Sequence, residues 1–212
     1  MTESVHRIAI VGGTFDPMHR GHIDPLLDVI DPMEWDRILY VPAAQQPFKQ
    51  DRQTAAPLHR WAMAALATSS HPRLHLSSIE LDRGEMSYSV DTLEALARQE
   101  PGAAIDWVIG DDNLELLMQW RRIDRIFDLC NFVVLRRGDS SVPESLRERV
   151  VGVADRGRAG HLILLENRRT PVSSTEIRER IQQGKSIAGL VTGEVEEYIR
   201  KYGLYATGEK GA

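Results

Sequence analysis

Cysteine is almost missing from this sequence, since Cys130 is the single one among 212 residues. One cysteine excludes an intrachain disulfide and a cysteine-based zinc site, and its place before a strand-like run predicts a buried, inert thiol. The sequence also lacks an apolar run of membrane-spanning length, and residues 1–7 are too short and polar for the apolar core of a signal peptide. These absences predict a cytoplasmic protein without a membrane partner.

An excess of positive charge is missing as well. The 26 Lys and Arg residues are outnumbered by 31 Asp and Glu residues, which gives a formal net charge of −5. Binding along a nucleic-acid backbone needs clustered Lys and Arg, so no nucleic-acid partner is expected, although a local basic pocket for a small phosphate ligand is compatible with this charge. An apolar fraction of 42% and a charged fraction of 27% are ordinary for a globular protein of this length.

Strand-like and helical segments alternate along the chain. Strands are predicted at residues 7–11, 37–41, 73–79, 105–109, 132–135 and 161–165. Helices are predicted at residues 23–30, 54–70, 89–99 with Ser89 as N-cap, 114–128, 143–151, 174–183 with Gly184 behind its end, and 194–202. This alternation predicts an α/β fold with a doubly wound parallel sheet, whose ligands lie beyond the carboxyl ends of the strands. Residues 43–57 and 138–142 are expected to be loops, and residues 206–212 a disordered tail.

The most informative segment follows the first of these strands. It runs Gly12-Gly13-Thr14-Phe15-Asp16-Pro17-Met18-His19-Arg20-Gly21-His22 and leads into a helix-like apolar spacing. Glycines let a backbone approach phosphate closely, and the N-terminus of a helix attracts anions. Two histidines there can donate hydrogen bonds to phosphoryl oxygens as charge develops. Each element alone is common in turns and on surfaces, but the joint pattern favours a phosphate site that relies on histidines and not on the lysine of a P-loop.

This segment resembles the signature of the nucleotidyltransferase superfamily, whose members carry His-x-Gly-His after the first strand. Its full form is most similar to that of bacterial nicotinate-nucleotide adenylyltransferases. The resemblance extends from about Arg7 to Tyr205 and implies a Rossmann-like nucleotidyltransferase fold in one domain over residues 1–212. It further implies ATP-binding residues at Gly12, Gly13, Thr14 and Phe15, and catalytic residues on the phosphoryl oxygens at His19 and His22.

A second motif, Val172-Ser173-Ser174-Thr175-Glu176-Ile177-Arg178, follows Pro171. Hydroxyls at a helix N-terminus with an arginine one turn later can form an anion site, although Ser/Thr caps beside surface arginines are also common. The motif resembles the superfamily's Ile-Ser-Ser-Thr-x-Ile-Arg, with Val172 in place of Ile. The resemblance implies that residues 171–205 complete the ATP site, with phosphate contacts from Ser173, Ser174, Thr175 and the catalytic Arg178.

Two segments extend the resemblance to the nucleoside half of ATP. Gly110-Asp111-Asp112 follows a predicted strand and resembles the family's Gly-x-Asp, which implies that Gly110 and Asp112 bind ATP, with Asp112 on a ribose hydroxyl. An aspartate that caps the next helix is compatible with this role. Arg136 stands where the family has an arginine after a strand and is expected to border the nucleotide.

Three residues are expected at nicotinate mononucleotide. Trp120 stands where the family places a tryptophan that stacks on the nicotinate ring, although a tryptophan at this place is usually part of a core. Residues 87–93 resemble the family's Ser-Tyr-Thr-x-x-Thr-Leu, with Ser89 in place of Thr. Pro47-Phe48-Lys49 resembles the family's Pro-His-Lys, with Phe48 in place of the histidine. Lys49 keeps the positive charge, which can contact a phosphate or remain solvated in the loop.

The reaction implied by the resemblance is adenylyl transfer from ATP to nicotinate mononucleotide. Mg²⁺ is expected to arrive on the ATP phosphates, and no protein residue is assigned as a metal ligand. Two alternatives stay open: another adenylyltransferase of the superfamily, acting on nicotinamide mononucleotide or pantetheine phosphate, and a non-catalytic nucleotide sensor. Retention of both His19 and His22 argues against the sensor. The sequence leaves the oligomeric state unknown.

Overall fold

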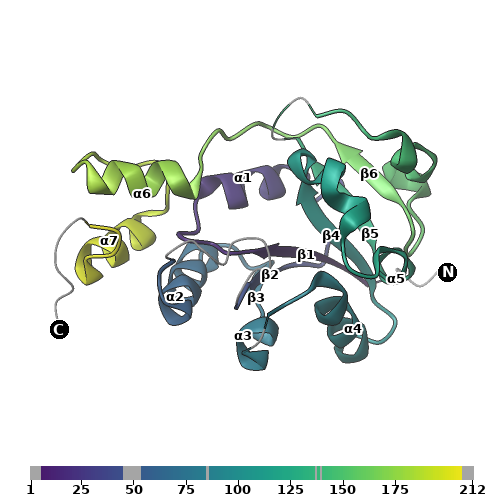
Figure 1. Ribbon diagram of the computed structural model, residues 1–212, viewed down its shortest axis with the longest axis horizontal. Coiled ribbons are helices and arrows are strands. Elements are labelled where there is room, and N and C mark those ends of the chain that lie inside the picture. Colours follow the sequence, from purple (N-terminus) through teal and green to yellow (C-terminus); the bar gives the residue numbers. More distant parts are fainter. Residues whose placement is uncertain (1–5, 45–53, 85, 137, 139, 207–212) are drawn as a thin grey trace.

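The computed structural model describes residues 6–44, 54–84, 86–136, 138 and 140–206. Its centre is a six-stranded sheet in the order β3-β2-β1-β4-β5-β6 (Figure 1). The strands are β1 (Arg7–Gly13), β2 (Arg37–Pro42), β3 (Leu74–Leu76), β4 (Ala104–Gly110), β5 (Asn131–Leu135) and β6 (Leu162–Leu165). Every neighbouring pair is parallel, which confirms the predicted doubly wound α/β fold. The order reverses between β1 and β4, and such a switch point is where ligands of open α/β sheets bind.

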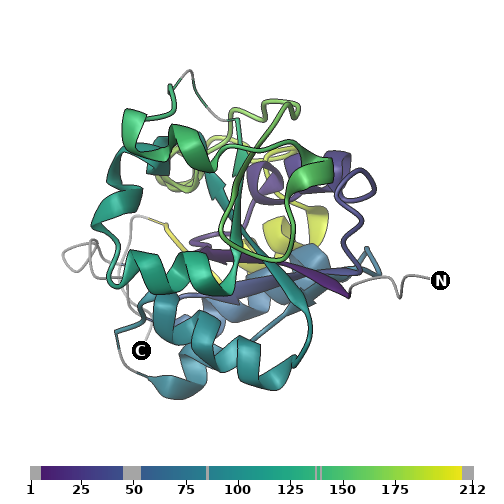
Figure 2. The ribbon, with the colours of Figure 1, turned by 90° about the vertical axis from the view of Figure 1, so that its right-hand side faces the viewer.

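Helices cover both faces of the sheet (Figures 1 and 2). The α-helices are α1 (Arg20–Val29), α2 (Pro57–Thr68), α3 (Ile79–Arg83), α4 (Ser89–Gln99), α5 (Ile123–Leu129), α6 (Ser174–Gln182) and α7 (Gly193–Tyr202). Three 3₁₀ segments complete the fold: η1 (Asp111–Gln119), η2 (Glu144–Arg149) and η3 (Val153–Asp155). Figure 1 shows α1 on one side of β1, and α3 and α4 on the other. No helix within the described ranges is long and apolar enough to span a membrane.

Two apolar clusters hold the helices against the sheet. Ala9 and Val11 of β1 belong to the first cluster, together with buried residues of α1, α2, α6 and α7. Ile8 and Ile10 belong to the second, together with α4, η1 and α5. Successive residues of one strand therefore serve opposite faces, because side chains alternate along a strand. Each fully buried aliphatic side chain stabilises this arrangement by roughly 1.5–3 kcal/mol.

Several predicted boundaries are wrong, each for a local reason. The strand predicted at 73–79 ends at Leu76, because β3 is an edge strand paired only with β2 and the chain turns into α3 at Ile79. The helix predicted from residue 54 starts at Pro57, whose fixed φ and missing N–H suit a first helical turn. Ser89 is not the predicted N-cap: Tyr88 has the extended conformation of a cap, and Ser89 is already helical.

The single helix predicted at 114–128 is also wrong. The chain forms η1 up to Gln119 and then breaks, because Trp120 is extended and Arg122 is left-handed with φ 55°. The chain then resumes as α5. The segment predicted as a helix at 143–151 is the short 3₁₀ segment η2. In contrast, Gly184 has φ 66° and follows the end of α6 as expected for a glycine stop.

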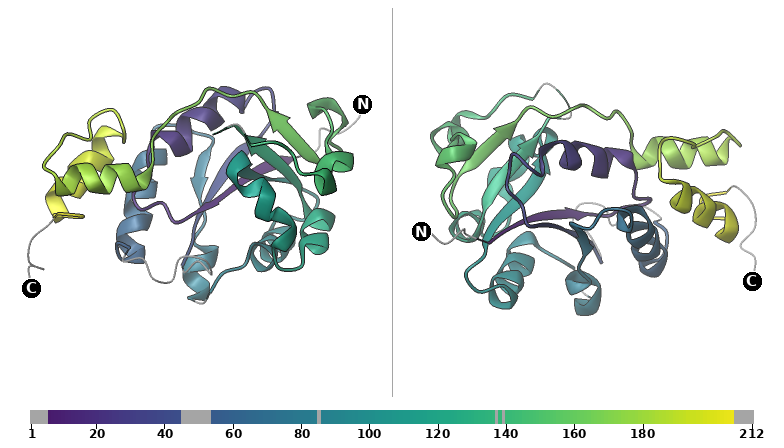
Figure 3. Two further views of the ribbon diagram at one scale, coloured as in Figure 1. Left: turned by 45° about the horizontal axis from the view of Figure 1, so that its top comes forward. Right: turned by 180° about the vertical axis from the view of Figure 1, so that it is seen from behind.

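The two C-terminal helices reach back to the start of α1. Figure 3 shows α6 and α7 together at one end of the molecule, beside α1 and α2. The Arg20 N–H donates to the Leu190 carbonyl at 2.9 Å, and the Ser174 hydroxyl donates to the Pro17 carbonyl at 3.0 Å. The fold thus places the second motif against the signature segment, although more than 150 residues separate them in sequence.

Candidate active site

The signature glycines lie where backbone and aromatic rings approach closely. A Cβ at Gly12 would stand 3.1 Å from the Trp107 ring of β4, and a Cβ at Gly13 would stand 2.8 Å from the Phe15 ring. Phe15 itself is buried and has φ 51°, so the chain turns sharply under its own ring. Glycine is therefore required here to bring the backbone past the carboxyl end of β1, at the switch point of the sheet.

The two signature histidines form a stacked pair at the start of α1. His19 is the N-cap residue and is buried, and its ring lies 3.7 Å from the His22 ring at an interplanar angle of 26°. The His19 N–H donates to Nδ1 of His22 at 3.3 Å, and Phe15 packs its ring edge against His22 at 5.1 Å. The Tyr40 hydroxyl donates to the His22 carbonyl at 2.9 Å. Both rings are thus held in fixed orientations at a helix N-terminus.

The hydrogen bond between His19 and His22 has a consequence for the proton on His22. Because Nδ1 of His22 accepts the backbone N–H, the neutral ring carries its proton on Nε2. In that tautomer, Nε2 is a hydrogen-bond donor on the side of the ring away from the His19 N–H.

The second motif forms the N-terminus of α6. Ser173 is its N-cap and accepts from the Glu176 N–H at 3.1 Å, while Ser174 is committed to Pro17 of the signature segment. Arg178 donates from Nη1 to the Asp16 carbonyl at 2.7 Å and from Nη2 to the Thr175 hydroxyl at 3.2 Å. The predicted phosphate residues of the two motifs are therefore brought together, and Ser174 serves at least to join them.

A buried ionic network lies directly behind these contacts. The Asp16 carboxylate is 3% exposed; its Oδ1 accepts from the Tyr205 hydroxyl at 2.7 Å and from the Ala55 N–H at 3.1 Å. Its Oδ2 lies 3.7 Å from Nη1 of Arg178. Burial first, and then the Asp16 charge and hydrogen bond, raise the pKa of Tyr205, so its hydroxyl keeps the proton that it donates.

Arg60 of α2 forms the other half of this network. Its guanidinium is 2% exposed and donates to four carbonyls, those of Thr14, Ala43, Ala44 and Ala55, at 2.7 to 3.2 Å. Burial lowers the pKa of Arg60, and the nearby Asp16 charge opposes that effect. Arg60 thus fixes the turn at Thr14 relative to the segments that follow β2 and precede α2.

A second group of predicted residues lies at the ends of β4 and β5. Gly110 ends β4, and the Asp112 side chain is exposed and accepts from Asn113 at 3.0 Å. Asp111 is the buried member of this turn, and both of its carboxylate oxygens accept from the Gly138 N–H at 3.1 Å. Arg136 forms an ion pair with Glu166 at 2.7 Å. Asp111 therefore connects the ends of β4 and β5. Its neighbour Asp112 is exposed to solvent.

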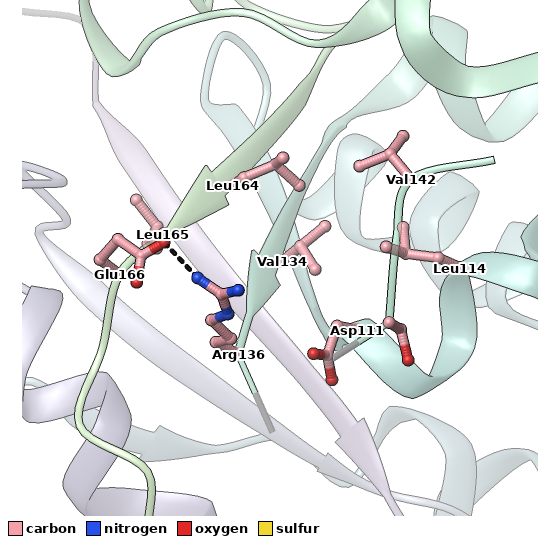
Figure 4. A pocket seen from close by; sticks show the side chains of 9 residues that line it. Asp111, Leu114, Val134, Arg136, Val142, Leu164, Leu165 and Glu166 are labelled. Atoms are coloured by element: carbon pink, nitrogen blue, oxygen red, sulfur yellow. Dashed lines mark hydrogen bonds and ion pairs between the residues drawn. The ribbon is translucent and has the colours of Figure 1, made fainter. Parts of the chain in front are cut away.

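A cavity of about 150 Å³ lies between these strand ends and β6 (Figure 4). Its apolar side chains come from η1, β5, β6 and Val142, while Asp111 and the Arg136–Glu166 pair lie at its edge. The cavity includes Arg136 of the predicted ATP residues, but its lining contains neither the histidine pair nor Arg178. It lies toward the β6 edge of the sheet and is distinct from the histidine site.

Comparison with known proteins identifies the family of this chain. Residues 10–180 match the model of the family described as cytidylyltransferase-like. The chain belongs to the cytidylyltransferase-like family.

Relatives within this family narrow the assignment. A protein of Corynebacterium jeikeium is 35% identical over 199 residues, which cover 94% of this chain and 100% of the relative. One of Roseiflexus sp. is 38% identical, with 93% and 97% covered. Both carry the name probable nicotinate-nucleotide adenylyltransferase, which confirms the resemblance drawn from the signature. The fold matches that of a Plasmodium falciparum nicotinic acid mononucleotide adenylyltransferase, complexed with NaAD, at a TM-score of 0.72, 22% identity and coverage of 94% and 97%.

Of the three residues expected at nicotinate mononucleotide in this cytidylyltransferase-like chain, the structure describes two, Trp120 and Ser89. Trp120 is half-buried and packs edge-on against Trp107 and Phe132 at 6.5 and 5.8 Å, so part of it belongs to the second core cluster. Ser89 lies at the first turn of α4, and Thr92 of the same helix donates to the buried Glu80 at 2.7 Å. Burial raises the pKa of Glu80. Lys49 lies outside the described residues, as do Pro47 and Phe48.

The sequence did not reveal four residues whose contacts connect the segments of this cytidylyltransferase-like site. In the sequence Asp16 stands out only as part of the signature, and no pattern indicates a binding role for Arg60, Asp111 or Tyr205; the structure shows their contacts. Of these residues, Asp111 had a usable signal, since it stands directly behind a predicted buried strand, where a charged side chain is rarely buried without a partner. Over the described residues, no group of three or more His, Cys, Asp or Glu side chains is placed to hold a metal ion.

Proposed function

We propose that this chain catalyses adenylyl transfer from ATP to nicotinate mononucleotide, with nicotinate adenine dinucleotide and pyrophosphate as products, in NAD biosynthesis. The observation that carries the proposal is the stacked His19–His22 pair at the N-terminus of α1, next to the N-terminus of α6. The names of the relatives, nicotinate-nucleotide adenylyltransferases over almost the whole chain, support the same acceptor.

In the proposed reaction, an oxygen of the acceptor's 5′-phosphate attacks the α-phosphorus of ATP in line. The new P–O bond forms as the bond between the α-phosphorus and the bridging oxygen breaks, and pyrophosphate leaves with that electron pair. The attacking phosphate is already an anion at neutral pH, so no residue has to remove a proton from it. The protein's contribution is positioning and neutralisation of charge.

The histidines and Arg178 are proposed as the residues that neutralise this charge. His19 and His22 donate to phosphoryl oxygens of ATP, and the proton on Nε2 of His22 suits that role. Gly12, Gly13, Thr14 and Phe15 place their backbone along the nucleotide. Arg178, with Ser173, Ser174 and Thr175 at the start of α6, holds the departing phosphates, so that residues 171–205 complete the ATP site within one domain.

The remaining proposed contacts divide between the two substrates. Gly110, Asp112 and Arg136 border the adenosine half, where the exposed Asp112 carboxylate can accept from ribose hydroxyls. Ser89, Trp120 and Lys49 are assigned to nicotinate mononucleotide. ATP is proposed to bind as its Mg²⁺ complex; the ion neutralises phosphate charge, keeps much of its water shell, and requires few protein ligands. The proposed compartment is the cytoplasm.

Pyrophosphate release across a panel of acceptors tests the function. The purified chain is incubated with ATP and, separately, nicotinate mononucleotide, nicotinamide mononucleotide and pantetheine phosphate. We expect the acid to be the preferred mononucleotide, because a carboxylate accepts at both oxygens whereas an amide also brings hydrogens toward the same donors. Equal use of the amide would remove the nicotinate assignment and leave adenylyl transfer. ATP binding without pyrophosphate release from any acceptor would favour a sensor.

Replacement of Arg178 by alanine is expected to weaken ATP binding by roughly 10- to 100-fold, the range of a hydrogen bond to a charged group. Binding of nicotinate mononucleotide should change little, because Arg178 is placed at the phosphates that leave. Calorimetric titration of each ligand separately measures both affinities. The matched control is Arg180→Ala, in the same helix, whose guanidinium pairs with Glu176 and not with the signature segment. Wild-type affinity for ATP in the Arg178 variant would leave Arg178 with a structural role, through its contacts to Asp16 and Thr175, and no role at the phosphates.

Replacement of Trp120 by alanine is expected to raise KM for nicotinate mononucleotide while KM for ATP stays the same. Stacking contributes roughly 0.5–1.5 kcal/mol beyond area burial, which corresponds to an increase of about two- to tenfold. Trp120 also packs on Trp107 and Phe132, so the variant loses stability as well. Trp120→Phe separates the two effects, since it keeps a stacking ring. A parallel rise in both KM values would assign Trp120 to the core alone.

A further inference from the structure

The last residues of the described chain return to the signature segment. Gly203 ends α7 in the left-handed conformation, and the Leu204 N–H donates to the Ile199 carbonyl at 3.1 Å. Tyr205 follows with φ 66°, a conformation that costs a side-chain-bearing residue roughly 1–3 kcal/mol unless its surroundings hold it there. Two kinds of contact hold it there: its hydroxyl donates to Oδ1 of Asp16 at 2.7 Å, and its side chain packs against the first apolar cluster.

Asp16 transmits this contact to Arg178. Tyr205 and the Ala55 N–H both donate to Oδ1, so the carboxylate is turned with Oδ2 toward Nη1 of Arg178, 3.7 Å away. The carbonyl of Asp16 accepts from the same Nη1 at 2.7 Å. Arg178 is therefore held by the backbone and the charge of one residue, whose orientation is fixed by a hydroxyl 189 positions further along the chain.

We propose that Tyr205 is a positioning residue for ATP: through Asp16 it fixes the direction of the Arg178 guanidinium. Two of the five guanidinium donors are engaged by Asp16 and Thr175 among the contacts described, and the proposal assigns the others to the ATP phosphates. The C-terminal turn thus contributes to the reaction without touching a substrate. The inference rests on the proposed role of Arg178 at the ATP phosphates.

The test is a double-mutant cycle read by calorimetric ATP binding, which does not depend on which acceptor the chain uses. Tyr205→Phe keeps the ring and removes only the hydroxyl. We expect this variant to bind ATP about three- to tenfold more weakly, the range of one hydrogen bond of ordinary net strength. Its affinity for nicotinate mononucleotide should stay at the wild-type value. In the Arg178→Ala background, Tyr205→Phe should add no further loss.

Tyr198→Phe is the matched control. Tyr198 lies on α7 and its hydroxyl contacts His59 of α2 at 2.9 Å, so this variant also removes one hydroxyl contact between the C-terminal helices and α2, but not at Asp16. We expect its ATP affinity to equal that of the wild type, even where thermal unfolding shows an equal loss of stability in the two phenylalanine variants.

Three outcomes would overturn the proposal: unchanged ATP affinity in Tyr205→Phe, equal weakening of both ligands, or the same loss again in the Arg178→Ala background. The last would mean that Tyr205 acts independently of Arg178. Failure of the proposed function is recognised separately, by a wild-type chain that binds ATP but releases no pyrophosphate with nicotinate mononucleotide.

Discussion

Replacement of His22 by alanine lowers kcat by about 10² to 10³ in the proposed reaction, with little change in the fold. The expected loss is that of one preorganised donor to charge that develops in the transition state. The His22 imidazole is preorganised, because its stacking on His19 and the hydrogen bond from the His19 N–H orient the ring before substrate binds. Steady-state pyrophosphate release measures kcat, and thermal unfolding checks the fold.

Two further variants make the His22 result specific. His22→Gln places an amide donor near the position of Nε2 and should recover part of the lost rate, whereas His75→Ala removes an exposed histidine of the edge strand β3 and should change nothing. His19→Ala should be as damaging as His22→Ala, and the two losses should not add, because both residues are proposed to act on one phosphoryl group. Near-normal turnover in His22→Ala would remove His22 from the catalytic residues.

The parallel sheet and the place of the signature segment could be predicted because both depend on local patterns. Runs such as residues 132–135 are apolar without alternation, which is typical of strands covered on both faces, and β5 is buried along its whole length. Once strands and helices alternate, right-handed crossovers leave few topologies, and residues that follow strands meet at one edge. For this reason the sequence predicts the signature segment and Gly110–Asp112 at that edge, and the structure has them there.

Contacts between distant segments could not be predicted in the same way. Tyr205 and Asp16 are 189 positions apart, and no periodicity connects them. Arg60 stands in a helix whose pattern leaves it equally consistent with the solvent side, and only the four carbonyls around it explain its burial. The break at Trp120 and Arg122 likewise follows from tertiary packing, since the sequence 114–128 has no glycine or proline to stop a helix.

Replacement of Arg60 by methionine is expected to lower the free energy of unfolding by about 3 to 5 kcal/mol, because it removes a buried cation while the carbonyls that it served stay in place. Methionine fills much of the same volume, so the loss reports the hydrogen bonds and the charge beside Asp16 more than a cavity. Chemical denaturation at an unchanged m value measures it.

Arg98→Met is the control for Arg60→Met, since Arg98 is an exposed arginine of α4 and its loss should stay within about 0.5 kcal/mol. Arg60→Lys should fall between the two, because an ammonium keeps the charge but has three donors for four carbonyls. A stability loss in Arg60→Met no larger than that of Arg98→Met would mean that water or neighbouring donors replace the guanidinium. In that case the Thr14 turn would not depend on α2, and ATP affinity should also survive the substitution.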